Sequence, residues 1–213
     1  MSPSRSDLDR AAIVWLTGLS GAGKSTVAEA LKTALRELHV PSYVLDGDHL
    51  RRGLCRDLGY SPEDRAENLR RAGEVAKLLT AAGLLVIAAF ISPCRSDREV
   101  ARAAAQGPRF IEVFIDCPLD ECIRRDPKGL YRRALRGETP HFTGVSAPYE
   151  RPPAPDVHLR TDRTSVAQGV DAILRHLERA GLLPTLAPIR SARPIAALDD
   201  ASASARAAPD GDT

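Results

Sequence analysis

The 213-residue chain lacks the patterns of a metal site, a disulfide framework or a membrane span. Its four cysteines form no C-x-x-C pair, and no histidine stands at metal-ligand spacing from them, so we expect reduced thiols. The longest apolar stretch, residues 78–91, is interrupted by Thr80 and Gly83 and is too short to cross a bilayer. The first ten residues lack the apolar core of a signal peptide. We therefore expect a cytoplasmic protein with no membrane partner.

The chain also lacks a strong excess of either charge. Thirty Lys and Arg residues against 28 Asp and Glu residues give a net charge of +2, too small to predict a nucleic-acid partner. The length allows one full hydrophobic core and no internal repeat is visible, so we expect a single domain over residues 11–183. The composition predicts a disordered leader at 1–10 and, beyond Pro184, a disordered tail at 184–213 that is rich in Ala, Ser, Asp and Pro.

What the chain does contain is a phosphate-binding loop. The apolar run 13–17 leads into Gly-Leu-Ser-Gly-Ala-Gly-Lys-Ser at residues 18–25, a full match to G-x-x-x-x-G-K-[ST] between a strand and a helix. The glycines let backbone N–H groups point at phosphate oxygens, while Lys24 reaches the β- and γ-phosphates and Ser25 binds Mg²⁺. A glycine-rich turn with a chance lysine is the alternative, and the complete match disfavours it. The predicted ATP-binding residues here are Gly18, Leu19, Ser20, Gly21, Ala22, Gly23, Lys24, Ser25 and Thr26.

Hydrophobic periodicity predicts alternating strands and helices. The strands are expected at 11–17, 42–45, 84–91, 109–116 and 157–159, and the helices at 25–38, 62–82, 96–106, 118–125, 128–137 and 164–180. Ser61, Pro62 and Asp64 form a start signal for the long second helix, with Asp64 at the position of a capping-box acid. The alternation predicts a P-loop NTPase-type three-layer α/β/α fold with a mostly parallel five-stranded sheet and a helical lid.

The P-loop by itself fits a GTPase, a motor, a nucleotide sensor or a small-molecule kinase. The guanine-reading N-K-x-D pattern is absent, and the short chain has no second nucleotide module, so we favour the kinase. A kinase needs a base, a metal ligand, an acceptor site and a cationic lid. Asp46 and Asp48 close the second strand, at the sheet edge where α/β proteins bind ligands, and can hold a Mg²⁺-bound water and accept a proton. The alternative for this pair is an Asp-Gly turn with solvated acids.

Several arginine residues follow along the chain, and some of them could form a binding site for an anion. Arg65 and Asn68 lie three residues apart on one helix face, where a guanidinium and an amide can grip an anionic group together with Arg51. The alternative is a solvated face whose arginines, including Arg70 and Arg71, form ion pairs with neighbouring acids on the helix.

Residues 10–183 resemble adenylyl-sulfate kinase, which uses ATP to phosphorylate the 3′-hydroxyl of adenosine 5′-phosphosulfate. The resemblance rests on 18–25 and on blocks at 45–48, 58–61, 63–68, 73–77, 89–93, 125–131 and 142–144. It implies that Asp48 is the catalytic acid/base beside Lys24. It further implies a Mg²⁺ ion held by Ser25, Asp48 and, through water, Asp46.

The same resemblance implies the remaining site residues. Those that would contact the acceptor are Asp48, Arg51, Tyr60, Arg65, Asn68, Ile91, Ser92, Lys128 and Phe142, with Tyr60 and Phe142 sandwiching its adenine. Arg125 and Lys128 would lie on the lid, and Arg125 would bind ATP. Ser92 is either a phosphoserine intermediate or an acceptor contact in direct in-line transfer. The resemblance also implies a homodimer, and any ATP sulfurylase activity would belong to a separate polypeptide partner.

Three positions depart from the family pattern. His49 and Arg52 replace an Asn and a His, Tyr60 replaces a Phe, and Thr139-Pro140-His141 lacks a usual cation, which would weaken acceptor binding. The Pro140 region supports one other hypothesis, a kinase of the same fold that acts on another small hydroxyl acceptor. A third hypothesis is a non-catalytic nucleotide-binding subunit of a sulfurylase, which the intact Lys24, Ser25, Asp46 and Asp48 disfavour.

Overall fold

Five parallel strands form the central sheet of the molecule. The computed structural model describes residues 11–105 and 109–183, and the predictions for 1–10 and 184–213 lie outside them. The strand order is β2-β3-β1-β4-β5, with bounds Ile13–Thr17 for β1, Ser42–Asp46 for β2, Leu85–Ala89 for β3, Phe110–Asp116 for β4 and Val157–Arg160 for β5. The central strands β1, β3 and β4 are buried along their whole length, which explains their continuous apolar sequences.

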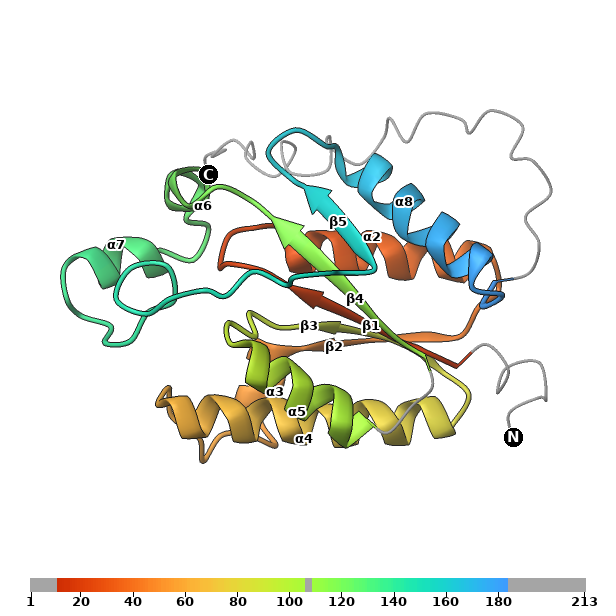
Figure 1. The fold of residues 1–213 in the computed structure, drawn as a ribbon, viewed down its shortest axis with the longest axis horizontal. Helices are drawn as coiled ribbons and strands as arrows, with labels where there is room; N and C mark the ends of the chain where they lie inside the picture. The colour runs from red at the N-terminus through yellow and green to blue at the C-terminus, as the bar shows by residue number, and fades with distance from the viewer. Residues whose placement is uncertain (1–10, 106–108, 184–213) are drawn as a thin grey trace, which may run out of the picture.

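Helices cover both faces of this sheet (Figure 1). One layer contains α2 (Lys24–Glu37) and α8 (Val166–Arg179), and the other contains α4 (Pro62–Ala81) and α5 (Arg95–Ala105). The short helices α3 (Gly47–Arg52), α6 (Leu119–Arg125) and α7 (Leu130–Leu135) follow the carboxyl ends of strands. The predicted three-layer α/β/α class is confirmed, and all strand pairings are parallel.

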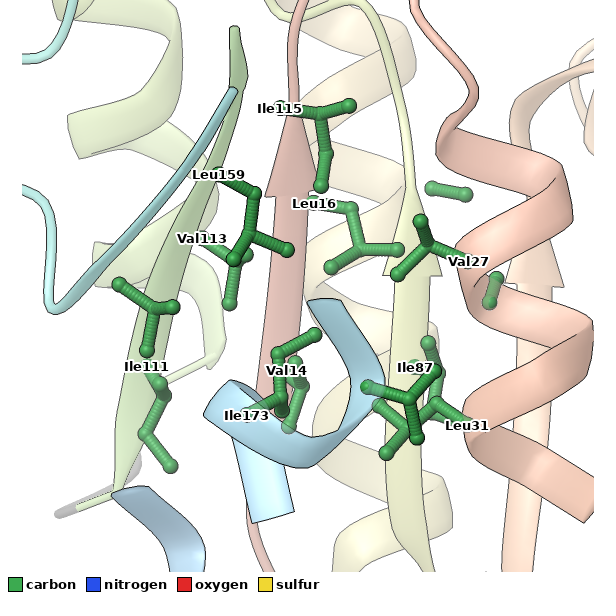
Figure 2. Packing of buried hydrophobic residues seen from close by; sticks show 14 of the residues in the cluster. Val14, Leu16, Val27, Leu31, Ile87, Ile111, Val113, Ile115, Leu159 and Ile173 are labelled. Atoms are coloured by element: carbon green, nitrogen blue, oxygen red, sulfur yellow. The ribbon is translucent and has the colours of Figure 1, made fainter. Parts of the chain in front are cut away.

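The alternation of side chains along β1 divides the core into two clusters. Val14 and Leu16 pack with Val27 and Leu31 of α2 and Ile173 of α8, as Figure 2 shows. The next residues along the strand point the other way, and Trp15 stacks between Phe90 and Phe110 at centroid distances of 4.9 and 5.5 Å. Burying each large apolar side chain contributes about 1.5–3 kcal/mol, so the two clusters hold both helix layers to the sheet.

Two local expectations are corrected. The sequence predicted no helix after Asp46, yet α3 begins at Gly47, with the Asp46 carboxylate accepting from the Asp48 N–H at 2.9 Å. None of the residues of α3 is buried, so it has no apolar periodicity to reveal it. Ser61 caps α4 as predicted, but the Asp64 carboxylate accepts from the Gly59 N–H at 2.9 Å in place of closing a capping box.

Candidate nucleotide-binding site

The phosphate-binding loop connects β1 to α2 at the carboxyl edge of the sheet. Gly21 and Gly23 have φ angles of 72° and 100°, which other residues rarely adopt. A side chain at Gly18 would place its Cβ 2.4 Å from the carbonyl oxygen of Ile115, so glycine is also required there. No side chain caps the N-terminus of α2, and no acidic residue occupies its first turn. The N–H groups of that turn are therefore free to bind an anion.

The Lys24 side chain bends back over this loop. Its Nζ donates to the carbonyl oxygens of Gly18 at 2.9 Å and Leu19 at 2.7 Å. Burial lowers the pKa of Lys24 to about 8, because the charged ammonium is removed from water. A phosphate in the loop would restore a counter-charge to this ammonium.

Ser25 and the two predicted acids lie together at the mouth of the loop. The Ser25 hydroxyl donates to Asp46 Oδ2 at 3.0 Å, and the other Asp46 oxygen accepts from the Asp48 N–H. The Asp48 carboxylate forms an ion pair with Lys128, which belongs to the segment between α6 and α7. The structure thus brings the phosphate loop, both acids and the predicted lid lysine to one edge of the sheet.

The predicted arginine residues lie on α3 and α4, and they divide into two groups. Arg70 and Arg71 are paired with Glu67, and Arg71 also pairs with Asp57, so the solvated-face interpretation holds for these two. Within the described part of the chain, Arg51 and Arg65 have no carboxylate at ion-pairing distance. Burial and the nearby Arg51 both lower the pKa of Arg65. The Asp97 carboxylate also acts on Arg65 but forms no ion pair with it in the described residues, so these two neighbouring cations favour the binding of an anion.

Neutral oxygen atoms hold these two guanidinium groups in place. Arg51 donates to the Gly59 carbonyl at 2.8 Å and lies 4.4 Å from the centroid of the exposed Tyr60 ring. Arg65 donates to the Tyr60 carbonyl at 3.0 Å and to the Thr143 hydroxyl at 2.7 Å. Both side chains are therefore oriented without being neutralised.

Asn68 lies one helical turn beyond Arg65. It is 4% exposed, and its Oδ1 is the one buried side-chain N or O atom in the described residues without a hydrogen-bond partner. An unpaired buried acceptor costs about 1–3 kcal/mol, so it calls for a donor that the protein itself does not supply.

The two predicted aromatic residues differ in their surroundings. Tyr60 is 59% exposed beneath Arg51, whereas Phe142 is 8% exposed and packs edge-on against Tyr131, with centroids 5.1 Å apart. Tyr131 in turn donates its hydroxyl to the Ser20 carbonyl of the phosphate loop at 3.0 Å. The structure therefore ties Phe142 to the loop through Tyr131, a residue that the sequence analysis did not single out although it lies within the 125–131 block.

Ser92 follows β3 and is almost completely buried. Its Oγ donates to Thr17 Oγ1 at 2.8 Å and accepts from Trp15 Nε1 at 3.2 Å. Ile91 precedes it, and the Ile91 carbonyl accepts from Thr17 Oγ1 at 2.9 Å. A hydroxyl enclosed in this way favours the in-line alternative over a phosphoserine intermediate.

A cavity of about 230 Å³ lies behind the phosphate loop, between α2 and the loop that follows β5. Its lining includes Gly23, Thr26 and Arg125 from the predicted set, with Thr161 and Thr164 from the loop after β5. Arg125 donates to the Thr161 carbonyl at 2.9 Å, and Thr161 Oγ1 donates to the Ala22 carbonyl at 2.8 Å. Sequence reasoning missed both threonines, although the rule that ligands bind at the carboxyl ends of strands points to the end of β5.

Comparisons with known proteins find similar chains in one family. A family model described as adenylylsulphate kinase matches residues 10–160. An adenylyl-sulfate kinase of Marinobacter nauticus is 51% identical over 171 residues, covering 80% of this chain and 86% of that protein. The bifunctional enzyme NodQ of Rhizobium sp. is 52% identical and covers 79% of this chain, which corresponds to 27% of NodQ. The structure of Mycobacterium tuberculosis APS kinase CysC in complex with AMPPNP and APS has a TM-score of 0.77 and 50% identity, covering 79% of this chain and 98% of that one.

Proposed function

The chain belongs to the adenylyl-sulfate kinase family, and from this premise we propose that it transfers the γ-phosphoryl group of ATP to the 3′-hydroxyl of adenosine 5′-phosphosulfate. One observation carries the proposal. The uncompensated cations Arg51 and Arg65 and the unpaired oxygen of Asn68 lie on the helices that flank the Asp46–Asp48 edge beside the phosphate loop. The site for the phosphoryl donor thus lies beside a site for an anion. At this second site, the unpaired Asn68 oxygen can accept a hydrogen bond from the bound molecule.

The donor nucleotide fits between the phosphate loop and the cavity behind it. The loop N–H groups and Lys24 would bind the phosphates of ATP, as the family's complex with AMPPNP supports. Its base would occupy the cavity at Thr26, Arg125 and Thr161, where the Arg125 guanidinium offers a flat surface for stacking.

A Mg²⁺ ion fits the oxygen ligands at the mouth of the loop. The Ser25 hydroxyl already lies 3.0 Å from an Asp46 oxygen, and Asp48 adds a second carboxylate. Mg²⁺ uses one or two protein carboxylates and completes its shell with water and phosphate, so few protein ligands suffice. Ser25 and Asp48 would hold the ion, with Asp46 acting through water. When bound, the ion neutralises charge on the β- and γ-phosphates.

Asp48 is the residue proposed to handle the proton. Its carboxylate accepts the proton of the 3′-hydroxyl as that oxygen bonds to the γ-phosphorus, and the bond from the γ-phosphorus to the bridging oxygen of ADP breaks. Lys128, already in contact with Asp48, would meet the negative charge of the transferred group as the lid closes. The Ser92 hydroxyl is enclosed and takes no covalent part in this step, and we assign the backbone around Ile91 and Ser92 to acceptor contacts.

The acceptor would bind across α3 and α4. Arg51 and Arg65 would hold its phosphosulfate, the Asn68 carbonyl oxygen would accept a hydrogen bond from it, and Tyr60 and Phe142 would supply aromatic contacts to its adenine. Pro140 stands where the family pattern has a cation, but the neighbouring Arg65 already approaches that segment through Thr143.

An acceptor panel tests this proposal. Purified protein with ATP and Mg²⁺ is offered adenosine 5′-phosphosulfate, adenosine 5′-monophosphate or gluconate, and ADP release is measured. We expect clear preference for the phosphosulfate, and absence of turnover with it at any concentration contradicts the proposal. Asp48→Asn should lower kcat about 10²- to 10⁴-fold, since the proton acceptor is lost. Asp120→Asn, at an exposed position on α6, is the matched control.

The assembly and its location complete the proposal. Family resemblance supports a homodimer, for which light scattering should report about twice 22.9 kDa. A region similar to this chain forms part of a bifunctional enzyme, which supports a link to a second enzyme. We propose that an ATP sulfurylase on a separate polypeptide is this partner, which co-purification would test. All four cysteines are free, which supports a cytoplasmic location, and no helix of the described residues is long and apolar enough to cross a membrane.

A further inference from the structure

Arg98, on α5, is a buried cation behind the loop that carries Ile91 and Ser92. It is 5% exposed, and its Nη1 donates to the carbonyl oxygens of Ser92 at 2.8 Å and Pro93 at 3.3 Å. Its Nη2 donates to the Glu150 carbonyl at 2.9 Å. One planar group therefore joins the loop after β3 to the chain that returns from the lid.

Glu112, on β4, provides the counter-charge. Its Oε1 lies 2.9 Å from Arg98 Nε, and the carboxylate side chain is also buried. A buried ion pair is costly to desolvate, and apolar residues of similar volume often stabilise a fold equally well. Stability alone is thus a weak reason for an arginine here, whereas a rigid fork of donors is well suited to fixing several carbonyl groups.

The loop that Arg98 fixes has an unfavourable backbone conformation. Ser92 has a φ angle of 40°, in the left-handed region that side chains disfavour, so surrounding contacts must hold it. Thr17, the residue before the phosphate loop, supplies some of these contacts, and its hydroxyl also lies 2.9 Å from that of Tyr149. Arg98 adds the shorter of two hydrogen bonds to the Ser92 carbonyl oxygen, at 2.8 Å, while Thr17 Oγ1 donates to the same oxygen at 3.3 Å.

We propose that Arg98 is a positioning residue for acceptor binding: through the Ser92 and Pro93 carbonyl groups, it holds Ile91 and Ser92 in the conformation that meets the acceptor. The inference rests on the proposed function, because it assigns Ile91 and Ser92 to the acceptor. Arg98 acts only through the loop, so its loss affects acceptor binding more than ATP binding.

Steady-state kinetics with adenosine 5′-phosphosulfate and ATP varied separately test this inference. The Arg98→Met/Glu112→Gln double variant removes the donors together with the charge that would otherwise stay buried and unpaired. We expect its acceptor KM to rise about tenfold, because small displacements of positioning groups have large effects on binding and rate. Its KM for ATP should remain within about twofold of wild type.

Two further variants separate positioning from stability. Glu112→Gln leaves the bonds from Arg98 to the loop intact, so it should lower the thermal unfolding temperature without changing the acceptor KM. Arg102→Met is the matched control, since Arg102 lies on the same helix, 3.9 Å from the same carboxylate, and does not contact the loop. If the double variant does not fold, Arg98→Lys is measured in its place. Its acceptor KM should rise about threefold, because lysine lacks the planar set of N–H donors that arginine has.

The outcomes distinguish this inference from the function on which it rests. Wild-type protein that does not phosphorylate adenosine 5′-phosphosulfate contradicts the proposed function, and this inference with it. Active wild-type protein combined with an unchanged acceptor KM in the Arg98 variants contradicts the inference alone. Equal rises in the KM for ATP and for the acceptor also contradict it, because they indicate a general loosening of the fold.

Discussion

The proposed donor and acceptor halves of the site are built in different ways. The donor half comes mainly from one continuous stretch, Gly18–Ser25, whose backbone forms the phosphate cradle and whose carbonyl groups also satisfy Lys24. The acceptor half takes side chains from α3, α4, the loop after β3 and the segment near Phe142, and leaves the Asn68 oxygen without a partner. A cradle of backbone atoms tolerates little variation, whereas separate side chains can be exchanged one at a time.

The departures from the family pattern agree with this difference. The phosphate loop matches its motif completely, while His49, Arg52, Tyr60 and Pro140 all belong to segments of the acceptor half. We therefore expect substitutions in the phosphate loop to lower kcat/KM by orders of magnitude. Substitutions in the acceptor half, apart from Asp48 with its role in proton transfer, should change acceptor affinity in smaller, measurable steps.

Among the variants that compare the two halves, the largest effect is expected in the donor half. Lys24→Met should lower kcat/KM on the order of 10²- to 10³-fold, because it removes a preorganised cation from the transferred phosphoryl group. Thermal unfolding should remain at or above the wild-type temperature, since the variant no longer buries an ammonium whose pKa is lowered to about 8. Lys32→Met, an exposed position on the same helix, is the control. An active Lys24→Met protein would break the distinction between the halves.

A smaller effect is expected from the unpaired oxygen of the acceptor half. Asn68→Leu keeps the branching of the side chain, with larger methyl groups, but removes the amide oxygen, so the acceptor KM should rise about tenfold, equivalent to about 1.4 kcal/mol for one hydrogen bond. The free energy of unfolding should be unchanged or higher, because the buried oxygen has no hydrogen-bond partner among the described residues. Kinetics and thermal denaturation measured together check both effects. A large loss of stability with an unchanged acceptor KM would assign Asn68 a purely structural role.

Tyr60 should give a graded result. Tyr60→Ala should raise the acceptor KM about fivefold, because it removes an exposed ring that supports Arg51 and stacks with the adenine. Tyr60→Phe should stay within about twofold of wild type, since it keeps the ring. If both variants raised the acceptor KM equally, the hydroxyl group of Tyr60 and not its ring would be responsible for acceptor binding.

The smallest expected effect is the pH dependence of ATP binding. Phosphate favours the charged form of Lys24, whose pKa in the ligand-free protein is about 8, so the Kd for ATP should increase about three- to fourfold between pH 7 and 8.5. Calorimetry in buffers of different ionisation enthalpy should detect proton uptake, and Lys24→Met should abolish it. In the ligand-free protein the sign for stability is the opposite. In the unfolded state Lys24 has its ordinary pKa of 10.5 and stays protonated, whereas in the folded state it loses its proton near pH 8. The free energy of unfolding should therefore rise between about pH 8 and 10.5.

The fold was largely readable from the sequence because its elements have strong periodic patterns. All five strands and the long helices were predicted, and their ends differ by a few residues at most. The helix α3 was missed because none of its residues is buried. Among the site residues, Tyr131, Thr161 and Arg98 escaped notice, since each contacts a partner that is distant in sequence: Ser20, Ala22 and Glu150, respectively.

The sequence alone determined the phosphate loop and the family, because both depend on residues that follow one another along the chain. It left open which arginines form ion pairs and whether Ser92 is accessible. Only the tertiary structure decided that Arg70 and Arg71 form ion pairs while Arg51 and Arg65 form none with the residues it describes, and that Trp15 and Thr17 enclose the Ser92 hydroxyl. The physical reason is that ion pairing and burial depend on distances between side chains, and the folding of separate segments onto one sheet edge sets these distances.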